Sequence, residues 1–272
     1  MSLKRVGLWM VICTVVAGPV VSLHAQEDTF EWKGRMSAAQ TLEVRGIVGE
    51  IRTSLASGQE AEVIARKRGD AGDFQEVAVE MATAGDRIVI CAVYGSWKHG
   101  QGRCHPDFDD RGRDEDRHRG NNIDVEVEYE VRLPAGVEFE GAMVSGDIRG
   151  EGLRSNVSMH TVEGRIYVAT TGRAWANTVS GDIEIEMGDF SGGDLDFNTV
   201  SGDITLWLPQ DFSADVDFSS LSGDFETDFE MTLRSKRSGW VGSRVRGTIG
   251  GGGRDLSLHT VSGDVELRRM RR

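Results

Sequence analysis

Apolar and polar residues alternate in a repeating pattern through the second half of the chain. Each unit of the pattern spans about 20 residues and is centred on a short phrase that reads V-S-G-D or a close variant. Apolar residues stand seven, five and two positions before the glycine of this phrase, and two and four positions after it. Mostly polar residues separate them, so the pattern predicts one strand on each side of a tight turn. The glycines are Gly146, Gly164, Gly181, Gly202, Gly223 and Gly263.

A strand–turn–strand unit cannot bury its apolar face alone, but stacked units share one continuous core. We therefore predict an all-β fold, a β-solenoid of the parallel β-helix type. Stacking would bury the isoleucines that follow the glycine in one column and the valines that precede it in another. A β-sandwich of irregular hairpins is the competing fold, and it does not require the columns to match. The two columns include Ile166, Ile183 and Ile204, and Val162, Val179 and Val200.

The predicted repeats occupy residues 134–272 and are interrupted once. The step from Gly223 to Gly263 is 40 residues, which is about two units. An alternating stretch with a basic turn lies inside this step. We interpret it as a hairpin insertion at about residues 228–250.

Residues 26–133 form a partly irregular N-terminal β region, which we expect to be continuous with the repeats in one domain. Its first part keeps the repeat spacing around Gly49 and predicts a degenerate first coil. Three later strands leave that spacing, which favours antiparallel hairpins. A charged insertion at 94–122 has no periodicity and is interpreted as a loop, whereas 123–133 alternates strictly. The first-coil residues are Leu42, Val44, Ile47 and Ile51, and the three strands are 62–66, 77–81 and 87–94.

The first 25 residues have the features of a secretory signal peptide. Lys4 and Arg5 precede a short apolar core, and Ala25 offers a small residue at the cleavage site. The core is too short to span a bilayer comfortably, so the processed chain is not expected to span the membrane. Ile12 precedes Cys13 where a lipoprotein signal would have a small residue, so no lipid anchor is expected. The protein is therefore predicted to be exported to the periplasm or the cell surface.

The charge of the chain argues against a nucleic-acid partner. The full sequence has a formal net charge of −13, and loss of Lys4 and Arg5 with the signal makes it more negative by 2. A strongly acidic surface repels phosphate backbones and favours a well-hydrated, soluble chain.

The signal peptide and five later stretches in combination resemble the bacterial putative-adhesin family, whose members are exported proteins with a repeated-β-strand domain of unassigned function. These stretches are RLPAGV at 132–137, the serial TVSGDI units at 178–183 and 199–204, and GTIGGGG at 247–253 before a final TVSGDVEL. The resemblance spans roughly residues 41–267. It implies an exported β-repeat fold and supplies no catalytic residue to transfer.

The aspartates that follow the phrase glycine share one column, and neighbouring coils of a solenoid lie about 4.8 Å apart. They can stabilise the turn by bonding to their own backbone, or they can bind calcium between coils. The calcium-binding nonapeptide pattern is absent and Arg165 interrupts the column, so the turn-forming role is favoured. No cofactor is predicted. The column consists of Asp147, Asp182, Asp203, Asp224 and Asp264.

Cys91 and Cys104 are the two cysteines left after removal of the signal. In an exported protein an even pair predicts a disulfide, here at the base of the insertion loop. A transition-metal site formed with His99, His105 and His118 is the alternative, but the spacing fits no standard zinc pattern.

The remaining polar and aromatic residues give no catalytic constellation, so we predict a protein without enzyme activity. The outward-facing aromatic residues could stack on sugars. The column of histidines and asparagines is typical of polar ladder packing. The clusters of basic residues could contact phosphate groups. These residues are Tyr167, Trp175 and Trp207; His160, Asn177, Asn198 and His259; and Arg234, Lys236, Arg237, Arg244, Arg246 and the C-terminal arginines.

The first functional hypothesis is a binding or scaffold protein of the cell envelope, with a protein or glycan partner. The second is a glycan-active enzyme of the polysaccharide-lyase or hydrolase type, since some β-helix proteins cleave glycans. Such enzymes have longer coils whose side loops build a groove. The third is an accessory role in envelope-stress signalling.

Overall fold

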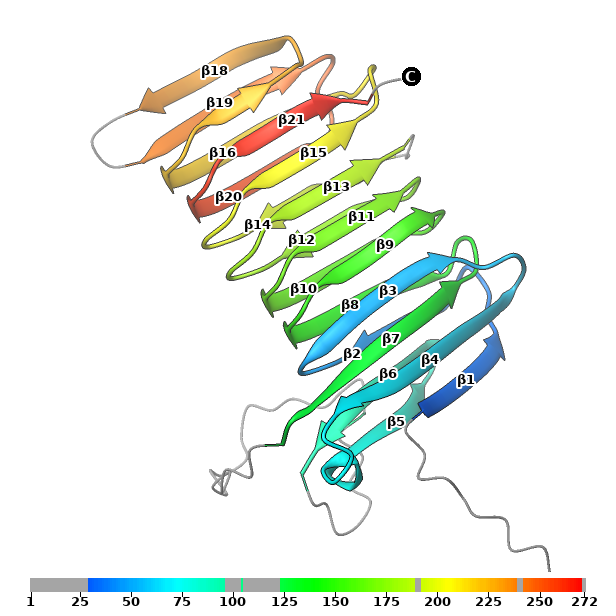
Figure 1. Cartoon of the computed structure of the whole chain (residues 1–272). Coiled ribbons are helices and arrows are strands. Elements are labelled where there is room, and N and C mark those ends of the chain that lie inside the picture. Colours follow the sequence, from blue (N-terminus) through cyan, green and yellow to red (C-terminus); the bar gives the residue numbers. More distant parts are fainter. Residues whose placement is uncertain (1–28, 96–103, 105–122, 189–191, 239–241, 271–272) are drawn as a thin grey trace, which may run out of the picture.

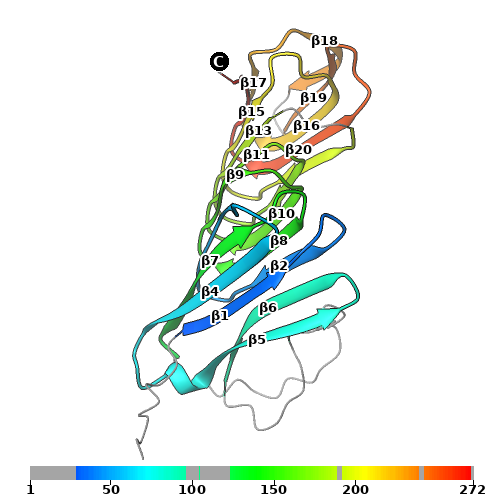
Figure 2. The same ribbon diagram turned by 90° about the vertical axis from the view of Figure 1, so that its right-hand side faces the viewer.

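The computed structural model describes residues 29–95, 104, 123–188, 192–238 and 242–270. Two sheets run along an elongated molecule (Figure 1), and a view turned by 90° shows them as two facing layers (Figure 2). A 3-10 turn, Phe74–Glu76, is the one helical element in the described part. None of the helical structure described there is long and apolar enough to cross a membrane. The predicted all-β solenoid is confirmed.

The first sheet has ten strands. In spatial order they are β1 (Thr29–Arg35), β4 (Glu60–Gly69), β7 (Val125–Leu133), β3 (Gly49–Leu55), β9 (Ile148–Leu153), β11 (Ile166–Thr170), β13 (Ile183–Met187), β15 (Ile204–Leu208), β21 (Val265–Arg269) and β17 (Phe225–Thr227).

The second sheet has eleven strands. In spatial order they are β18 (Met231–Ser238), β19 (Ser243–Ile249), β16 (Ala214–Ser222), β20 (Asp255–Ser262), β14 (Leu195–Asn198), β12 (Ala174–Asn177), β10 (Val157–Glu163), β8 (Glu138–Ser145), β2 (Thr41–Arg45), β6 (Arg87–Tyr94) and β5 (Val77–Ala84).

Each repeat contributes one strand to each sheet, and the strands of repeats that are neighbours in the stack pair in parallel. Ile183 pairs with Ile166 on one side and with Ile204 on the other, and all three are buried. The columns seven and five positions before the glycine are likewise buried, as Leu195 and Phe197 show. The same positions of each repeat point to the interior, so one core runs through the whole stack.

The valine column is the one part of the predicted core that is wrong. Val162, Val179 and Val200 are between 44% and 47% exposed. Side chains alternate between the faces of a strand, so residues seven, five and three positions before the glycine share the inner face. The inner position is therefore taken by threonine, for example Thr178, and the valine beside it faces outward.

The last repeat does not follow the one before it in space. Strand β21 lies between β15 and β17, and β20 lies between β14 and β16. After β15 the chain skips one position of the stack and builds β16 and β17. It then forms the antiparallel hairpin β18–β19 and returns to fill the gap. The 40-residue step in the sequence thus contains a hairpin that extends the second sheet beyond β16.

The N-terminal region begins the stack and mixes two pairing directions. Strands β2 and β3 form the degenerate first coil, with Leu42 opposite Phe139 and Ile51 opposite Ile148. Strand β6 also joins β2 in parallel, whereas β5–β6, β1–β4 and β4–β7 pair antiparallel. Alternate residues of β7 from Val125 onward face the core, as the strict alternation predicts.

Candidate functional site

The phrase glycines allow the coils to approach one another at the turn. Gly181 has a φ of 145° and Gly202 one of 150°, a region that residues with a Cβ rarely adopt. A Cβ on Gly181 would also collide with the carbonyl oxygen of Gly164 in the neighbouring coil. Glycine is therefore required twice over, by the backbone conformation and by the close contact between turns.

The aspartate column links neighbouring coils. The Asp182 carboxylate accepts a hydrogen bond from the backbone N–H of Asp203 at 3.0 Å, and Asp203 accepts one from Asp264 at 2.8 Å. The sequence predicts a hydrogen bond from each aspartate to the backbone of its own turn, whereas in the structure the aspartate accepts a hydrogen bond from the next coil. Among the described residues no cluster of histidine, cysteine and acidic side chains could hold a metal ion. The other links run from the N–H of Arg165 to Asp147 and from the N–H of Asp224 to Asp264.

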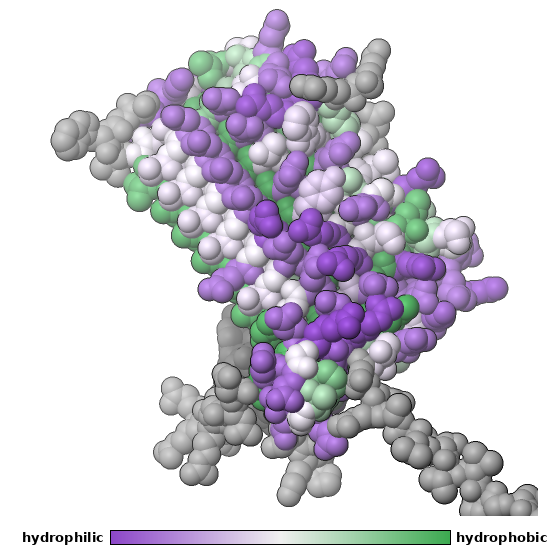
Figure 3. Space-filling view, in the orientation of Figure 1, coloured by the Kyte–Doolittle hydropathy of each residue, from purple (hydrophilic) through white to green (hydrophobic). Residues whose placement is uncertain are grey.

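A column of exposed aliphatic side chains lies two positions before each phrase glycine, along the turns that join the second sheet to the first. We call it the aliphatic stripe. It contains seven of the nine large apolar side chains that are exposed in the described part of the chain. Figure 3 shows green side chains along this edge of the solenoid, at the left of the view. In spatial order the stripe is Ile47, Val144, Val162, Val179, Val200, Val261 and Leu221, with exposures between 39% and 56%.

Small polar residues flank the stripe on one side. The residue after each stripe member is serine in most coils, and these serines bridge from coil to coil. Glu163 takes the serine position in one coil and is the one charged residue of this flank among the described residues. Soluble monomers rarely expose continuous apolar patches larger than a few hundred Å², and patches above that size mark interaction sites. The serines are Ser145, Ser180, Ser201, Ser222 and Ser262.

The column of histidines and asparagines lies on the other flank and forms the polar ladder that the sequence indicates. The Asn198 amide donates to Asn177 at 2.6 Å, and the Asn177 side chain contacts His160 Nδ1 at 3.2 Å. Further along, Ser219 Oγ lies 2.7 Å from His259 Nδ1. These groups bind one another, which is consistent with a structural role.

The outward aromatic residues do not form one platform. Trp175 lies on β12 in the second sheet, whereas Trp207 and Tyr167 lie on β15 and β11 in the first. The Arg173 guanidinium lies over the Trp175 ring, 4.9 Å from its centroid. A cation in this position already occupies the ring face that a sugar would need.

Four of the described basic residues near the C-terminus have acidic partners within the protein. Arg234 pairs with Asp215 at 2.7 Å, and Arg244 and Arg246 share Asp217 at 2.9 and 3.0 Å. Hydrogen bonds from the Thr248 hydroxyl and the Gly253 N–H, together with Arg234, lower the pKa of Asp215. Arg268 similarly contacts Glu226, Asp228 and Glu266. This pairing weakens the hypothesis of a phosphate-binding surface here.

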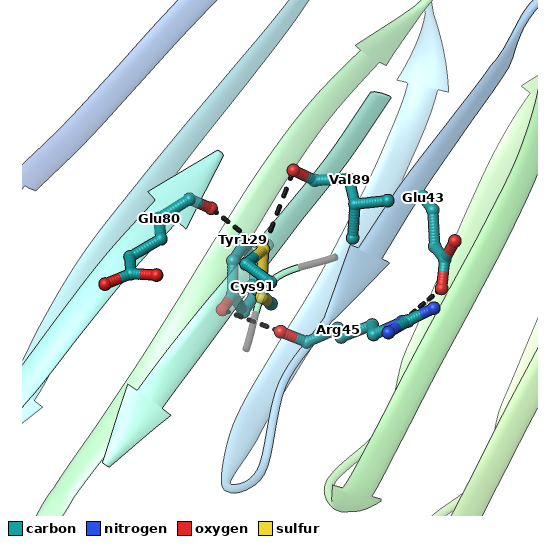
Figure 4. The surroundings of a disulfide bond; sticks show 7 residues. Glu43, Arg45, Glu80, Val89, Cys91 and Tyr129 are labelled. Atoms are coloured by element: carbon teal, nitrogen blue, oxygen red, sulfur yellow. Dashed lines mark hydrogen bonds and ion pairs between the residues drawn. A yellow bond between two sulfur atoms is a disulfide. The ribbon is translucent and has the colours of Figure 1, made fainter. Parts of the chain in front are cut away.

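Cys91 and Cys104 are joined in a disulfide with a Cα–Cα distance of 5.7 Å (Figure 4). Both sulfurs pack against Val89 on the outer side of the second sheet. A disulfide leaves no thiolate for a metal, so these cysteines do not provide the ligands of the alternative site. His99, His105 and His118, like most of the insertion loop, lie outside the described residues.

A network of charged residues close to the disulfide is not apparent from the sequence pattern. Glu43 is almost completely buried and contacts both Arg45 and Arg87, while Arg87 also contacts Glu140 at 2.7 Å. Nearby, the Tyr129 hydroxyl donates to the Arg45 carbonyl at 3.1 Å. Hydrogen bonding and ion pairing with Glu43 and Glu140, opposed by partial burial, raise the pKa of Arg87. Each charged side chain of the network is paired with another member, which favours a structural role.

The fold and these surfaces define an elongated all-β repeat protein with an exposed apolar edge. Residues 121–268 match the model of the Toastrack DUF4097 family, which is more than half of the chain. The chain belongs to this family. No curated protein matches it.

Several solved structures are similar in part. A putative cell adhesion protein from Clostridium sporogenes has 8% identity and a TM-score of 0.43, with 89% of this chain and 100% of that chain covered. A putative adhesin from Bacteroides fragilis has 10% identity and a TM-score of 0.28, with 89% and 97% covered. A putative lipid binding protein from Parabacteroides distasonis has 10% identity and a TM-score of 0.23, with 90% and 98% covered. Scores at this level do not carry a functional argument.

Proposed function

We propose that the protein is a non-enzymatic, exported binding or scaffold protein of the bacterial cell envelope. In this proposal the stacked coils serve as a rigid support and the aliphatic stripe is the surface that contacts a partner. Export is supported by residues 1–25, which have the charged start, apolar core and small cleavage-site residue of a signal peptide.

The observation that carries the proposal is the aliphatic stripe. Its seven side chains project from the same turn position in successive coils, and each is more than a third exposed. By contrast, the polar side chains that could bind a ligand are hydrogen-bonded to one another in ladders, as Asn177 and Asn198 are. The surface is therefore suited to binding through shape and apolar area.

Site-specific photo-crosslinking in intact cells tests the proposal. A photoreactive residue at Val179, in the middle of the stripe, is expected to give a light-dependent adduct in the envelope fraction. The matched control is Glu184, which is exposed on the outer face of β13 in the same coil. Equal adducts at the two positions, or none at Val179 in protein recovered from the envelope, would contradict the proposal.

A further inference from the structure

We propose that the aliphatic stripe is the interface of a homodimer, in which two copies of this chain pack stripe against stripe in antiparallel orientation. This inference rests on the proposed function, because it names the partner of the same surface. Three properties of the stripe support a second copy: its spacing, its lack of charge and its symmetry about one residue.

The spacing of the stripe matches that of another copy. Neighbouring coils are about 4.8 Å apart, so seven side chains span about 29 Å. A second stripe presents side chains at the same interval, and the two remain in register over this whole length. An α-helix has a pitch of about 5.4 Å and would lose register by several ångströms across the seven coils. A partner with the same repeat is therefore favoured over a helical one.

The charge distribution also favours this edge over the rest of the surface. The chain has a formal net charge of −13, so two copies repel each other in most orientations. The stripe itself is uncharged, with serines along one side and the ladder of His160, Asn177 and Asn198 along the other. Glu163 is the one acidic residue that interrupts the serine flank in the described part. The exposed aspartates of the phrase, such as Asp182 and Asp203, stand three positions after the stripe residues, so contact along the uncharged stripe reduces the repulsion between two copies without removing it.

The contact area reaches the minimum for a specific interface between two proteins. Seven aliphatic residues that are about half exposed on each copy, together with the serines beside them, would bury roughly 1,000 Å² in total. This is about the smallest area expected of a specific interface, so the homodimer would dissociate on dilution.

The order of the coils fixes how two antiparallel copies must meet. Val179 is the fourth of the seven stripe residues, with three coils on each side. A two-fold axis near Val179 would place it close to Val179 of the second copy, and Val162 close to Val200 of the second copy. This is the self-complementary arrangement of a two-fold dimer.

Cysteine cross-linking of the purified, signal-processed protein tests this arrangement. The native cysteines are held in their disulfide, so a single new thiol reports on the interface alone. Under mild oxidation, Val179→Cys is expected to give a covalent dimer, whereas Glu184→Cys, on the outer face of the same coil, is not. A mixture of Val162→Cys and Val200→Cys should give more dimer than either variant alone. Equal self-cross-linking of Val144→Cys and Val179→Cys would contradict the antiparallel orientation.

Light scattering provides a second measurement. The wild-type protein is expected to have twice the chain mass at micromolar concentration, and Val162→Glu/Val179→Glu/Val200→Glu is expected to have the mass of one chain. An unchanged circular dichroism spectrum shows that the triple variant is folded, as expected for substitutions at exposed positions. The control is Glu184→Gln, which should remain dimeric.

The outcomes separate this inference from the proposed function. A monomeric wild type with no Val179→Cys dimer overturns the homodimer. If Val179 then still gives an adduct with a different envelope component in cells, the proposed function stands. If Val179 gives no adduct in cells either, both fall.

Discussion

Thr178 and Val179 are adjacent in the chain, yet the threonine is 5% exposed and the valine 47% exposed. The threonine hydroxyl donates to the carbonyl oxygen of Gly164 in the neighbouring coil at 3.3 Å. The same arrangement recurs in Thr161, Thr199 and Thr260. The more polar residue therefore lies inside the turn because it bonds there to the next coil.

Hydropathy alone suggests that replacing the threonine by valine stabilises the protein and that replacing the valine by threonine destabilises it. We expect the threonine to be the more sensitive position. Thr178→Val keeps the shape but removes the hydrogen bond, so it should cost about 1 kcal/mol of unfolding free energy. Val179→Thr should change it by less than about 0.5 kcal/mol, because the position is exposed. Urea unfolding at low protein concentration, where association contributes little, measures both. A larger loss for Val179→Thr would mean that the valine is part of the core.

Because the turns of neighbouring coils lie close together, substitution of Gly181 should lower the free energy of unfolding strongly. Gly181→Ala must adopt an unfavourable positive φ and also collide with the Gly164 carbonyl oxygen. We expect a loss of more than about 3 kcal/mol. The matched control is Gly58→Ala, because nothing lies within 4 Å of a Cβ there. Similar melting temperatures for the two variants would contradict the contact between coils.

The period-two pattern predicts that neighbouring residues of β14 differ in how much they contribute to the free energy of unfolding. Phe197 is fully buried, and Phe197→Ala should cost about 3–5 kcal/mol. Asp196 is exposed and accepts a hydrogen bond from Asn198 at 2.9 Å. Asp196→Ala should therefore change the unfolding free energy by no more than about 0.5 kcal/mol. Thermal unfolding of the pair distinguishes the inner from the outer face.

The three tyrosines predict loss of stability at alkaline pH. Burial raises the pKa of Tyr94 to about 12, and it also raises the pKa values of Tyr129 and Tyr167. The folded state thus disfavours the ionised phenol. The stabilisation is complete below the unfolded pKa near 10 and is lost as pH rises through the folded values.

Absorbance of tyrosinate as a function of pH measures this effect. Ionisation of the native protein should begin above pH 10, and ionisation of the buried Tyr129 should coincide with unfolding. Tyr94→Phe removes one of the three groups, so its unfolding free energy should depend less steeply on pH above 10. Ionisation of all three tyrosines near pH 10 without unfolding would show that they are accessible to solvent.

The isoleucine column and the columns seven and five positions before the glycine could be predicted from the sequence, because burial depends on periodicity and each repeat shows the same periodicity. The prediction for the valine column is wrong because it rests on apolar character and not on the alternation of side chains along the strand. Counting in steps of two from Phe197 places Thr199 inside and Val200 outside. That signal was present in the sequence.

Other features depend on relationships that one repeat does not contain. Nothing in the sequence of the unit around Gly263 indicates that it fits between its two predecessors, because all the repeats have similar pairing edges. The acceptor role of Asp203 toward Asp264 also arises between coils. It depends on a spatial order that is set only when the chain has folded.

The aspartate column allows a sharp test of calcium binding. Asp182→Asn/Asp203→Asn keeps a carbonyl oxygen that can accept the N–H of the next coil, and it removes repulsion between like charges. We expect the double variant to melt at or slightly above the wild-type temperature. We also expect both proteins to be insensitive to millimolar calcium and to chelator. Asp182→Ala/Asp203→Ala, which removes the acceptors, should melt lower because two N–H groups lose their partners.

A calcium site would give a different result. The bound metal would stabilise the folded state by about 2.7 kcal/mol at a concentration one hundred times its dissociation constant. Chelator would then lower the melting temperature of the wild type, and the double asparagine variant would melt low and ignore calcium. A calcium-dependent rise in the wild type that is absent from this variant would therefore replace the coil-linking role of the column with a metal-binding one.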